Sequence, residues 1–237
     1  MEDSLYHGAA ALGLTLTDAQ LAAFDAYRRE LLRWNEQVNL TRIVDPAEIT
    51  SKHFLDSLSV WVALRQLPGA KRVIDVGSGA GFPGLPLKIA LPHLQVTLLE
   101  STGKKTKFLQ HVVQLLDLRG VTILTARAEE AGRQPAHRGQ YDVAVARAVA
   151  ALPVLAEYLL PLVRVGGRAI AQKGQAPADE LRAAANALGI LGGKALPPLP
   201  VSVPGLEGER HLIVLEKVKP TPPQYPRRAG TPAKKPI

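Results

Sequence analysis

The chain has 237 residues, of which 46% are hydrophobic and 21% charged, as expected for one large α/β domain with an extension. It contains no cysteine, which excludes disulfides, thiolate metal ligands and a cysteine nucleophile. No basic and apolar leader opens the sequence, and charges and prolines interrupt its most apolar stretch, residues 143–165. We therefore expect a cytoplasmic protein with no signal peptide and no membrane span.

The net charge of +8 is distributed unevenly along the chain. Residues 1–70 hold 6 Lys and Arg against 9 Asp and Glu, whereas residues 71–204 hold 16 against 9 and residues 205–237 hold 7 against 3. A phosphate-rich partner such as RNA or DNA would explain the basic part. A basic surface without any nucleic-acid role explains it as well, so charge alone leaves both interpretations open.

The first 70 residues have the pattern of a helical extension. Thr17 and Gln20 form a capping box, the signature of a helix start. Apolar side chains then recur at steps of three and four from Leu21 to Val38, which indicates one face of an amphipathic helix. A second helical pattern runs through residues 46–66 and ends near Pro68.

From Lys71 onward, predicted strands alternate with predicted helices. The strands are expected at residues 72–76, 95–99, 121–124, 141–146, 169–171 and 211–218, and the helices near residues 85–91, 105–116, 152–163 and 178–188. This alternation predicts an α/β fold with a mostly parallel, doubly wound sheet over residues 71–219, the final strand being inserted at an edge. Residues 197–204 should form a loop. The proline-rich, basic tail 220–237 should be extended and free to move.

The most informative segment is the glycine-rich turn DVGSGAGFPG, residues 75–84, which follows the first predicted strand. Such a turn at the end of a strand commonly holds a cofactor. The register starting at Gly79 matches the dinucleotide pattern G-x-G-x-x-G, and the register starting at Gly77 matches a looser G-x-G-x-G. Asp75 would repel a pyrophosphate but can serve the ammonium or sulfonium of S-adenosylmethionine, directly or through water. A third interpretation is a turn needed only for tight packing.

Glu100 stands 23 residues after Gly77, at the end of the second predicted strand. A carboxylate there can accept hydrogen bonds from two ribose hydroxyls, and it can do so for either cofactor. Asp75 therefore carries the preference for S-adenosylmethionine.

Several further motifs occur in one order along nearly the whole chain: WNEQVNLT (34–41), KHFLDSL (52–58), DVGSGAGFPGLPLKI (75–89), KK-x-x-FL (104–109), RAEE (127–130), VARAVA (145–150), RHLIVLEK (210–217) and YPRRAGTPAKKP (225–236). Together they resemble the small-subunit ribosomal RNA methyltransferase G family, formerly called glucose-inhibited division protein B. The resemblance implies a class I S-adenosylmethionine-dependent methyltransferase fold, Rossmann-like, with a seven-stranded sheet. It also implies methylation of guanine N7 in the decoding-region stem-loop, helix 18, of 16S rRNA.

The resemblance also implies cofactor contacts. In the glycine turn they are Gly77, Gly79 and Phe82, in addition to Asp75. After the second strand they are Glu100, Ser101 and Thr102, after the third strand Ala128 and Glu129, and after the fourth strand Arg147. Ala128 and Glu129 would border the adenine. Phe82 as a packing residue and Glu129 as a solvated carboxylate are the structural alternatives.

Guanine N7 carries a lone pair and loses no proton on methylation, so we expect positioning without an essential general base and identify no catalytic residue. His53 and His111 fit packing or surface positions better than catalytic ones, and the six histidines show no metal-ligand spacing. Arg147 is expected to grip a phosphate, guanine O6 or the cofactor carboxylate. Cations expected at the RNA entrance are Lys104, Lys105, Arg147, Lys173, Arg210, Arg227 and Arg228, although each is also explained as a solvated surface charge.

The expected partner is 16S rRNA in the small ribosomal subunit, bound by a monomer without metal. Two other functions fit parts of the sequence. A nicotinamide-dependent oxidoreductase would use the G-x-G-x-x-G register, and a ribosome-binding protein without activity could keep the cofactor fold.

Overall fold

The computed structural model describes residues 2–174 and 177–237, which form one eight-stranded sheet in the order β3-β2-β1-β4-β5-β8-β6, with β7 also paired to β8. Strands β1 to β5 are parallel, and β8 runs antiparallel to β5. The strands are β1 (Arg72–Val76), β2 (Gln95–Glu100), β3 (Val121–Thr125), β4 (Tyr141–Arg147), β5 (Val163–Lys173), β6 (Gly193–Ala195), β7 (Leu199–Pro200) and β8 (His211–Lys217).

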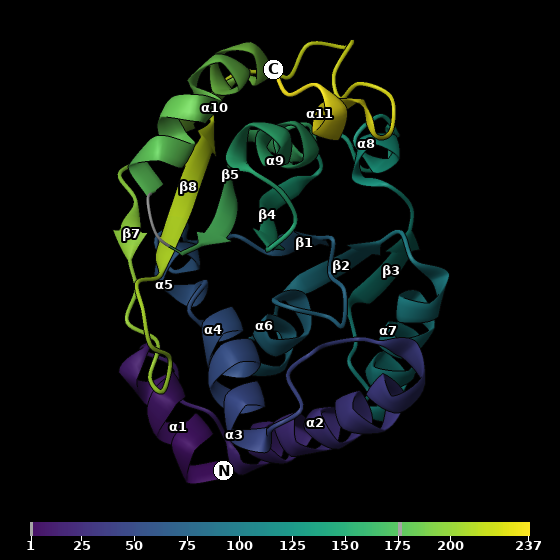
Figure 1. The fold of residues 1–237 in the computed structure, drawn as a ribbon, viewed down its shortest axis with the longest axis vertical. Coiled ribbons are helices and arrows are strands. Elements are labelled where there is room, and N and C mark those ends of the chain that lie inside the picture. The colour runs from purple at the N-terminus through teal and green to yellow at the C-terminus, as the bar shows by residue number, and fades with distance from the viewer. Residues whose placement is uncertain (1, 175–176) are drawn as a thin grey trace.

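Helices cover both faces of this sheet (Figure 1). On one face, α6 (Gly84–Ala90) and α7 (Gly103–Leu115) share a hydrophobic core with the N-terminal helices. On the other, α8 (Ala128–Ala131), α9 (Leu152–Leu159) and α10 (Pro177–Leu191) enclose a second core. None of the helices in residues 2–174 and 177–237 has the length and apolar character that crossing a bilayer demands.

The predicted α/β fold with a mostly parallel sheet is confirmed, but the sheet has eight strands where seven were expected, and several further details differ. The last strand, β8, is not the outermost one, because the short strands β6 and β7 pair with its far side. Strands of three and two residues are too short to show an alternating pattern, and β7 lies within the predicted loop 197–204. The predicted helix 152–163 ends earlier, at Leu159. β5 is much longer than the predicted strand 169–171, and its first half was missed because Gly166 and Gly167 interrupt the strand-like residue pattern there.

The N-terminal helices pack against the sheet domain through the apolar face that the sequence shows. α1 (Glu2–Ala11) precedes α2 (Asp18–Val38), and the predicted capping box of Thr17 and Gln20 opens α2. Tyr27 of α2 is fully buried, and its hydroxyl donates to the backbone carbonyl of Ala80 in the glycine turn. The helical extension therefore supports the turn directly.

Residues 46–66 do not form one continuous helix. They comprise α3 (Pro46–Ile49), a π-helical turn (Thr50–Leu55), α4 (Asp56–Leu58) and α5 (Trp61–Leu64). The hydroxyls of Thr50 and Ser51 donate back to carbonyls four residues earlier, a bond that competes with regular helix geometry. The wide turn is a feature often found at functional sites.

The C-terminal tail packs on the domain, so the expectation of an extended, free segment is wrong. Arg138 donates to the carbonyl oxygens of Thr221, Pro222 and Tyr225, and a short helix, α11 (Thr231–Lys234), ends the tail near α9. Arg227 holds the fully buried carboxylate of Glu157 on α9 through its backbone amide and its guanidinium. Proline content alone did not reveal these partners, which lie far away in the sequence.

Arg227→Ala should lower the free energy of unfolding by about 3–5 kcal/mol, because it leaves the Glu157 carboxylate buried without its cation. Urea denaturation measures the effect. The neighbouring Arg228 is exposed, so Arg228→Ala is the matched control and should change stability by less than about 0.5 kcal/mol. Equal effects of the two substitutions would contradict the assignment.

Candidate active site

The glycine turn leaves the end of β1 in conformations that suit glycine. Gly77, Gly79 and Gly81 have φ angles of +73°, +58° and +101°. A Cβ on Gly81 would lie 2.5 Å from the Leu85 side chain and 2.7 Å from the Tyr27 hydroxyl. A Cβ on Gly77 would lie 2.9 Å from Val149, in the segment that follows β4. The turn is thus closely enclosed by α2, α6 and the β4 exit.

Two carboxylates fix the turn. Asp75 is fully buried, and its Oδ2 accepts a hydrogen bond of 2.8 Å from the amide of Gly84 at the start of α6. Glu100 accepts from the amide of Gly79 through Oε2 and from the amide of Thr102 through Oε1, at 2.9 and 2.8 Å. The expected contact of Asp75 with a cofactor cation, directly or through water, stays a prediction. Glu100 keeps further lone pairs for ribose hydroxyls.

A pocket of about 90 Å³ lies beside the turn, and four of the residues expected at the cofactor line it: Gly77, Ser101, Ala128 and Glu129. Six lining residues were not expected at the cofactor, namely Val76, Leu99, Ala126, Arg127, Val149 and Tyr158. Tyr158 lies on α9, whose apolar pattern gives no sign that one side chain faces a ligand pocket.

Glu129 connects this pocket to the tail. Only 4% of Glu129 is exposed, and its Oε1 accepts a 2.7 Å hydrogen bond from the amide of Gly230. The alternative of a solvated carboxylate is therefore wrong for the described chain. The tail fixes one of the residues expected to border the adenine.

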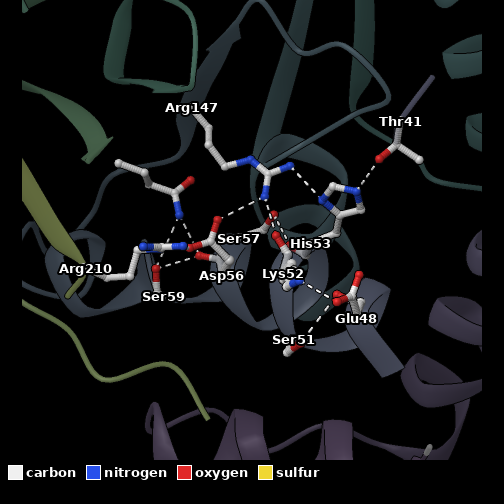
Figure 2. A network of polar contacts seen from close by, with 11 residues as sticks. Thr41, Glu48, Ser51, Lys52, His53, Asp56, Ser57, Ser59, Arg147 and Arg210 are labelled. Atoms are coloured by element: carbon white, nitrogen blue, oxygen red, sulfur yellow. Dashed lines mark hydrogen bonds and ion pairs between the residues drawn. The ribbon is translucent and has the colours of Figure 1, made fainter. Parts of the chain in front are cut away.

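Arg147, the last residue of β4, joins the sheet to the π-helical turn (Figure 2). Its Nη1 donates to the carbonyl of Lys52 at 2.8 Å and to Oδ2 of Asp56 at 2.9 Å, and its Nη2 lies 3.1 Å from Nδ1 of His53. The guanidinium carbon lies 5.0 Å from the centre of the Phe82 ring. Arg147 therefore uses most of its donors inside the protein.

His53 is a neutral acceptor in this network. Burial, with the nearby positive charge of Arg147, lowers the pKa of His53 to about 3. Neutral His53 can accept from Arg147 at Nδ1 and donate from Nε2 to the Thr41 hydroxyl, 2.8 Å away. Its ring stacks on Phe82, with 4.4 Å between the ring centres. Phe82 is 5% exposed, which agrees with its alternative role as a packing residue.

A second pocket, of about 540 Å³, is lined by Arg147 and by the residue that follows it, Ala148. It brings together three of the expected cations, Arg147, Lys173 and Arg210. It also contains three residues of the KHFLDSL and β5 segments to which the sequence analysis gave no site role, namely Lys52, Asp56 and Gln172. A third pocket, of about 650 Å³, shares Lys52 and Arg210 with it, so the two form neighbouring parts of one surface.

Lys104, Lys105 and Arg228 do not line these pockets. Lys104 and Lys105 begin α7, with Lys104 exposed, and Arg228 is exposed on the tail. Lys173 donates to the carbonyl of Ala150 and to Glu180, at 2.8 and 2.9 Å. His111, expected to pack or to lie at the surface, is partly exposed and lies 2.6 Å from Glu30. Across residues 2–174 and 177–237, no group of three or more His, Asp or Glu side chains has the arrangement of a metal site.

Comparison with known proteins relates the chain to one family. The model of the family described as rRNA small subunit methyltransferase G matches residues 20–213. The chain is similar to the ribosomal RNA small subunit methyltransferase G of Roseiflexus castenholzii, with 54% identity over 99% of each chain. It is also similar to the protein of that name from Chloroflexus aggregans, with 49% identity over 96% of this chain and 94% of the relative.

Solved structures show the same fold. A putative S-adenosyl-L-methionine-dependent methyltransferase from Methanococcus maripaludis is similar over 73% of this chain and 90% of its own, with a TM-score of 0.55 and 13% identity. A putative O-methyltransferase from Klebsiella pneumoniae is similar over 81% and 90%, with a TM-score of 0.54 and 17% identity. At these identities the likeness concerns the fold alone.

The burial of Asp75 predicts a pH dependence of stability. Burial raises the pKa of Asp75 from 3.8 to about 7, against the opposing effect of the Gly84 amide. The folded state then retains a proton that the unfolded state has lost, so stability falls as pH rises from about 4 to about 7. At about 1.4 kcal/mol per pH unit, the loss is on the order of 4 kcal/mol.

The measurement is urea denaturation of the wild type and of Asp75→Asn between pH 4 and pH 8. The stability of the wild type relative to the variant should fall over this range and level off above pH 7. A difference that stays constant or rises with pH would show that Asp75 is ionised throughout.

Proposed function

The chain belongs to the rRNA small subunit methyltransferase G family, and from this we propose how its two pockets divide the reaction. The chain is an S-adenosylmethionine-dependent methyltransferase of 16S rRNA that acts on guanine N7. Our proposal is that the 90 Å³ pocket receives the cofactor's adenosine and the 540 Å³ pocket receives the target base. We also propose that the base lies in the decoding-region stem-loop, helix 18, and that a monomer acts in the cytoplasm, where ribosomes are.

The observation that carries the proposal is the position of both pockets along one short segment. Arg147 and Ala148 line the larger pocket, and the next residue, Val149, lines the smaller one and covers Gly77. This segment follows β4, at the carboxyl edge of the sheet where ligands of such folds bind. A methyl donor in the 90 Å³ pocket and an acceptor base in the 540 Å³ pocket would therefore lie next to each other.

The residues of the smaller pocket suit S-adenosylmethionine. Gly77 leaves no side chain between backbone and ligand, and Ala128 with Glu129 would border the adenine. Glu100 does not line the pocket, but it holds the amide of Gly79 in the turn and has oxygen lone pairs for the ribose. When bound, the cofactor would supply a methyl carbon attached to a positively charged sulfur; the guanine N7 lone pair can attack this carbon while the sulfur leaves as a neutral thioether.

The chain's own residues act on the acceptor by positioning. No proton leaves N7, so the neutral, internally bonded His53 has no proton to take. Arg147 is an unsuitable neighbour for N7, which becomes positively charged, and its bonds to Lys52, His53 and Asp56 give it a positioning role. It would hold the π-helical turn, and with it one wall of the base pocket, against β4.

Lys173 lines the larger pocket but is bonded to Glu180 and to a backbone carbonyl, so we do not place it on the RNA backbone. For the RNA backbone we propose Lys52 and Arg210 around the larger pocket, with Lys104, Lys105 and Arg228 outside it. These cations would neutralise phosphates as the RNA approaches. Arg227 is left out of this group because its guanidinium holds the buried Glu157. Arg227 was expected among the RNA contacts because it lies in a basic Pro-Arg-Arg motif, and such a motif does not show that a side chain has a buried partner.

Methyl transfer is tested with S-adenosylmethionine carrying a labelled methyl group, offered with small ribosomal subunits and with naked 16S rRNA, followed by mapping of the modified base. We expect label at N7 of a guanine in helix 18. Label at another base would refute the target, and no label with either substrate would favour a ribosome-binding role without catalysis. Calorimetry with NADH is the control for the dinucleotide alternative and should show no binding.

The absence of a general base predicts a flat pH profile. Under single-turnover conditions, the methylation rate should change by less than about threefold between pH 6.5 and pH 8.5, because N7 of a neutral guanine needs no deprotonation. Rapid quench with labelled cofactor measures the rate. A tenfold rise per pH unit that disappears on substitution of one side chain would reveal a base.

A further inference from the structure

Within residues 2–174 and 177–237, two buried oxygen atoms in the wall of the larger pocket accept no hydrogen bond. They are Oδ1 of Asp56 and Oε1 of Gln172. The residues are 7% and 8% exposed, so neither oxygen is compensated by bulk water. A buried acceptor left without a donor costs about 1–3 kcal/mol. Two of them in one pocket wall indicate that donors arrive from a ligand.

The orientation of both groups is fixed by their other atoms. Nε2 of Gln172 donates to the backbone carbonyl of Asp56 at 2.6 Å and lies 3.4 Å from the hydroxyl of Ser59. Exchanging the amide oxygen and nitrogen would set an acceptor against that carbonyl, so Oε1 remains the free atom. Oδ2 of Asp56 is held by Arg147, which leaves Oδ1 as its free atom.

Arg210 lies next to Asp56 (Figure 2). Its Nε is 3.6 Å from Oδ1 of Asp56, which makes an ion pair but no hydrogen bond. The Arg210 side chain is 35% exposed and lines both the 540 Å³ pocket and the 650 Å³ pocket. It can therefore turn toward an RNA phosphate and uncover Oδ1 of Asp56 when the substrate enters.

We propose that Asp56 Oδ1 and Gln172 Oε1 recognise the Watson–Crick edge of the target guanine, an inference that rests on the proposed function of this pocket. Guanine presents two donors on that edge, N1–H and the N2 amino group, which match in number and kind the two acceptors of this pocket wall. Its N7 lies on the opposite edge of the purine. The two hydrogen bonds would thus hold the base while leaving N7 free for the methyl group.

Other occupants match the two acceptors poorly. A phosphate is drawn by the cations of the pocket but offers only acceptors, and it would leave both oxygens unpaired beside a negative charge. Adenine and cytosine each pair one amino donor with a ring-nitrogen acceptor on this edge, and uracil has a single N–H. Each would face one of the oxygens with an acceptor. Two unpaired acceptors therefore select guanine among the four bases.

The test compares guanosine with inosine at the target position of otherwise identical 16S rRNA assembled into small subunits. Inosine retains N7 and N1–H and lacks only the N2 amino group, so the reacting atom is unchanged. The wild type should methylate the inosine substrate with a kcat/KM roughly ten- to a hundredfold lower, the range expected for one lost hydrogen bond to a buried acceptor.

Two variants separate recognition from structural support. The variants are Gln172→Leu and Asp56→Asn, each of which removes one of the two acceptors. In the variant that removes the acceptor for the N2 amino group, the ratio of kcat/KM for guanosine to kcat/KM for inosine should fall toward one. A merely structural role would lower both rates and leave the ratio unchanged. Gln114→Leu replaces an exposed glutamine on α7 and should keep the wild-type ratio.

The outcomes are distinguishable. Equal methylation of both substrates by the wild type, or a wild-type ratio in both variants, overturns the recognition of guanine by this pair. Failure to methylate the guanosine subunits at all overturns the proposed function and this inference with it. If a variant does not fold, as judged by thermal unfolding, the wild-type comparison and the other variant still decide.

Discussion

The guanidinium of Arg147 is the contact on which the arrangement of the site depends. It ends β4, reaches the π-helical turn through Lys52, His53 and Asp56, and lies over the ring of Phe82 in the glycine turn. Three separate parts of the chain thus meet at one planar group with several fixed donors. Because those donors are used inside the protein, the guanidinium ties the end of β4 to the π-helical turn and to the glycine turn.

The glycine turn is fixed in a similar way from several sides. Asp75 holds Gly84, Glu100 holds Gly79, and the hydroxyl of Tyr27 holds Ala80 from the N-terminal extension. Two of these groups, Asp75 and Glu100, are acidic side chains that the sequence alone would assign to ligand binding. Their backbone bonds make the turn a preformed cradle, which lowers the entropy lost when a ligand binds. The C-terminal tail completes the cradle through the bond from Gly230 to Glu129.

Pairing of charges inside the protein also limits what its net charge can say. Of the cations expected to meet RNA, Arg227 is committed to the buried Glu157 and Lys173 to Glu180 and a carbonyl, whereas Arg228 and Lys104 are exposed. A sequence lists these side chains as equal charges. Their capacity to release counterions from RNA differs with their partners, and those partners come from distant parts of the chain.

The sequence by itself determined the strand and helix alternation, the capping box at Thr17, the glycine turn and the family, because these depend on local periodicity, on backbone freedom and on ordered motifs. Only the tertiary structure decided the position of β8, the packed tail, the backbone roles of Asp75 and Glu100, and the meeting of Asp56 with Gln172. Asp56 and Gln172 are separated by more than a hundred residues. No local pattern encodes such a contact, since the packing of a helical extension against the end of a sheet creates it.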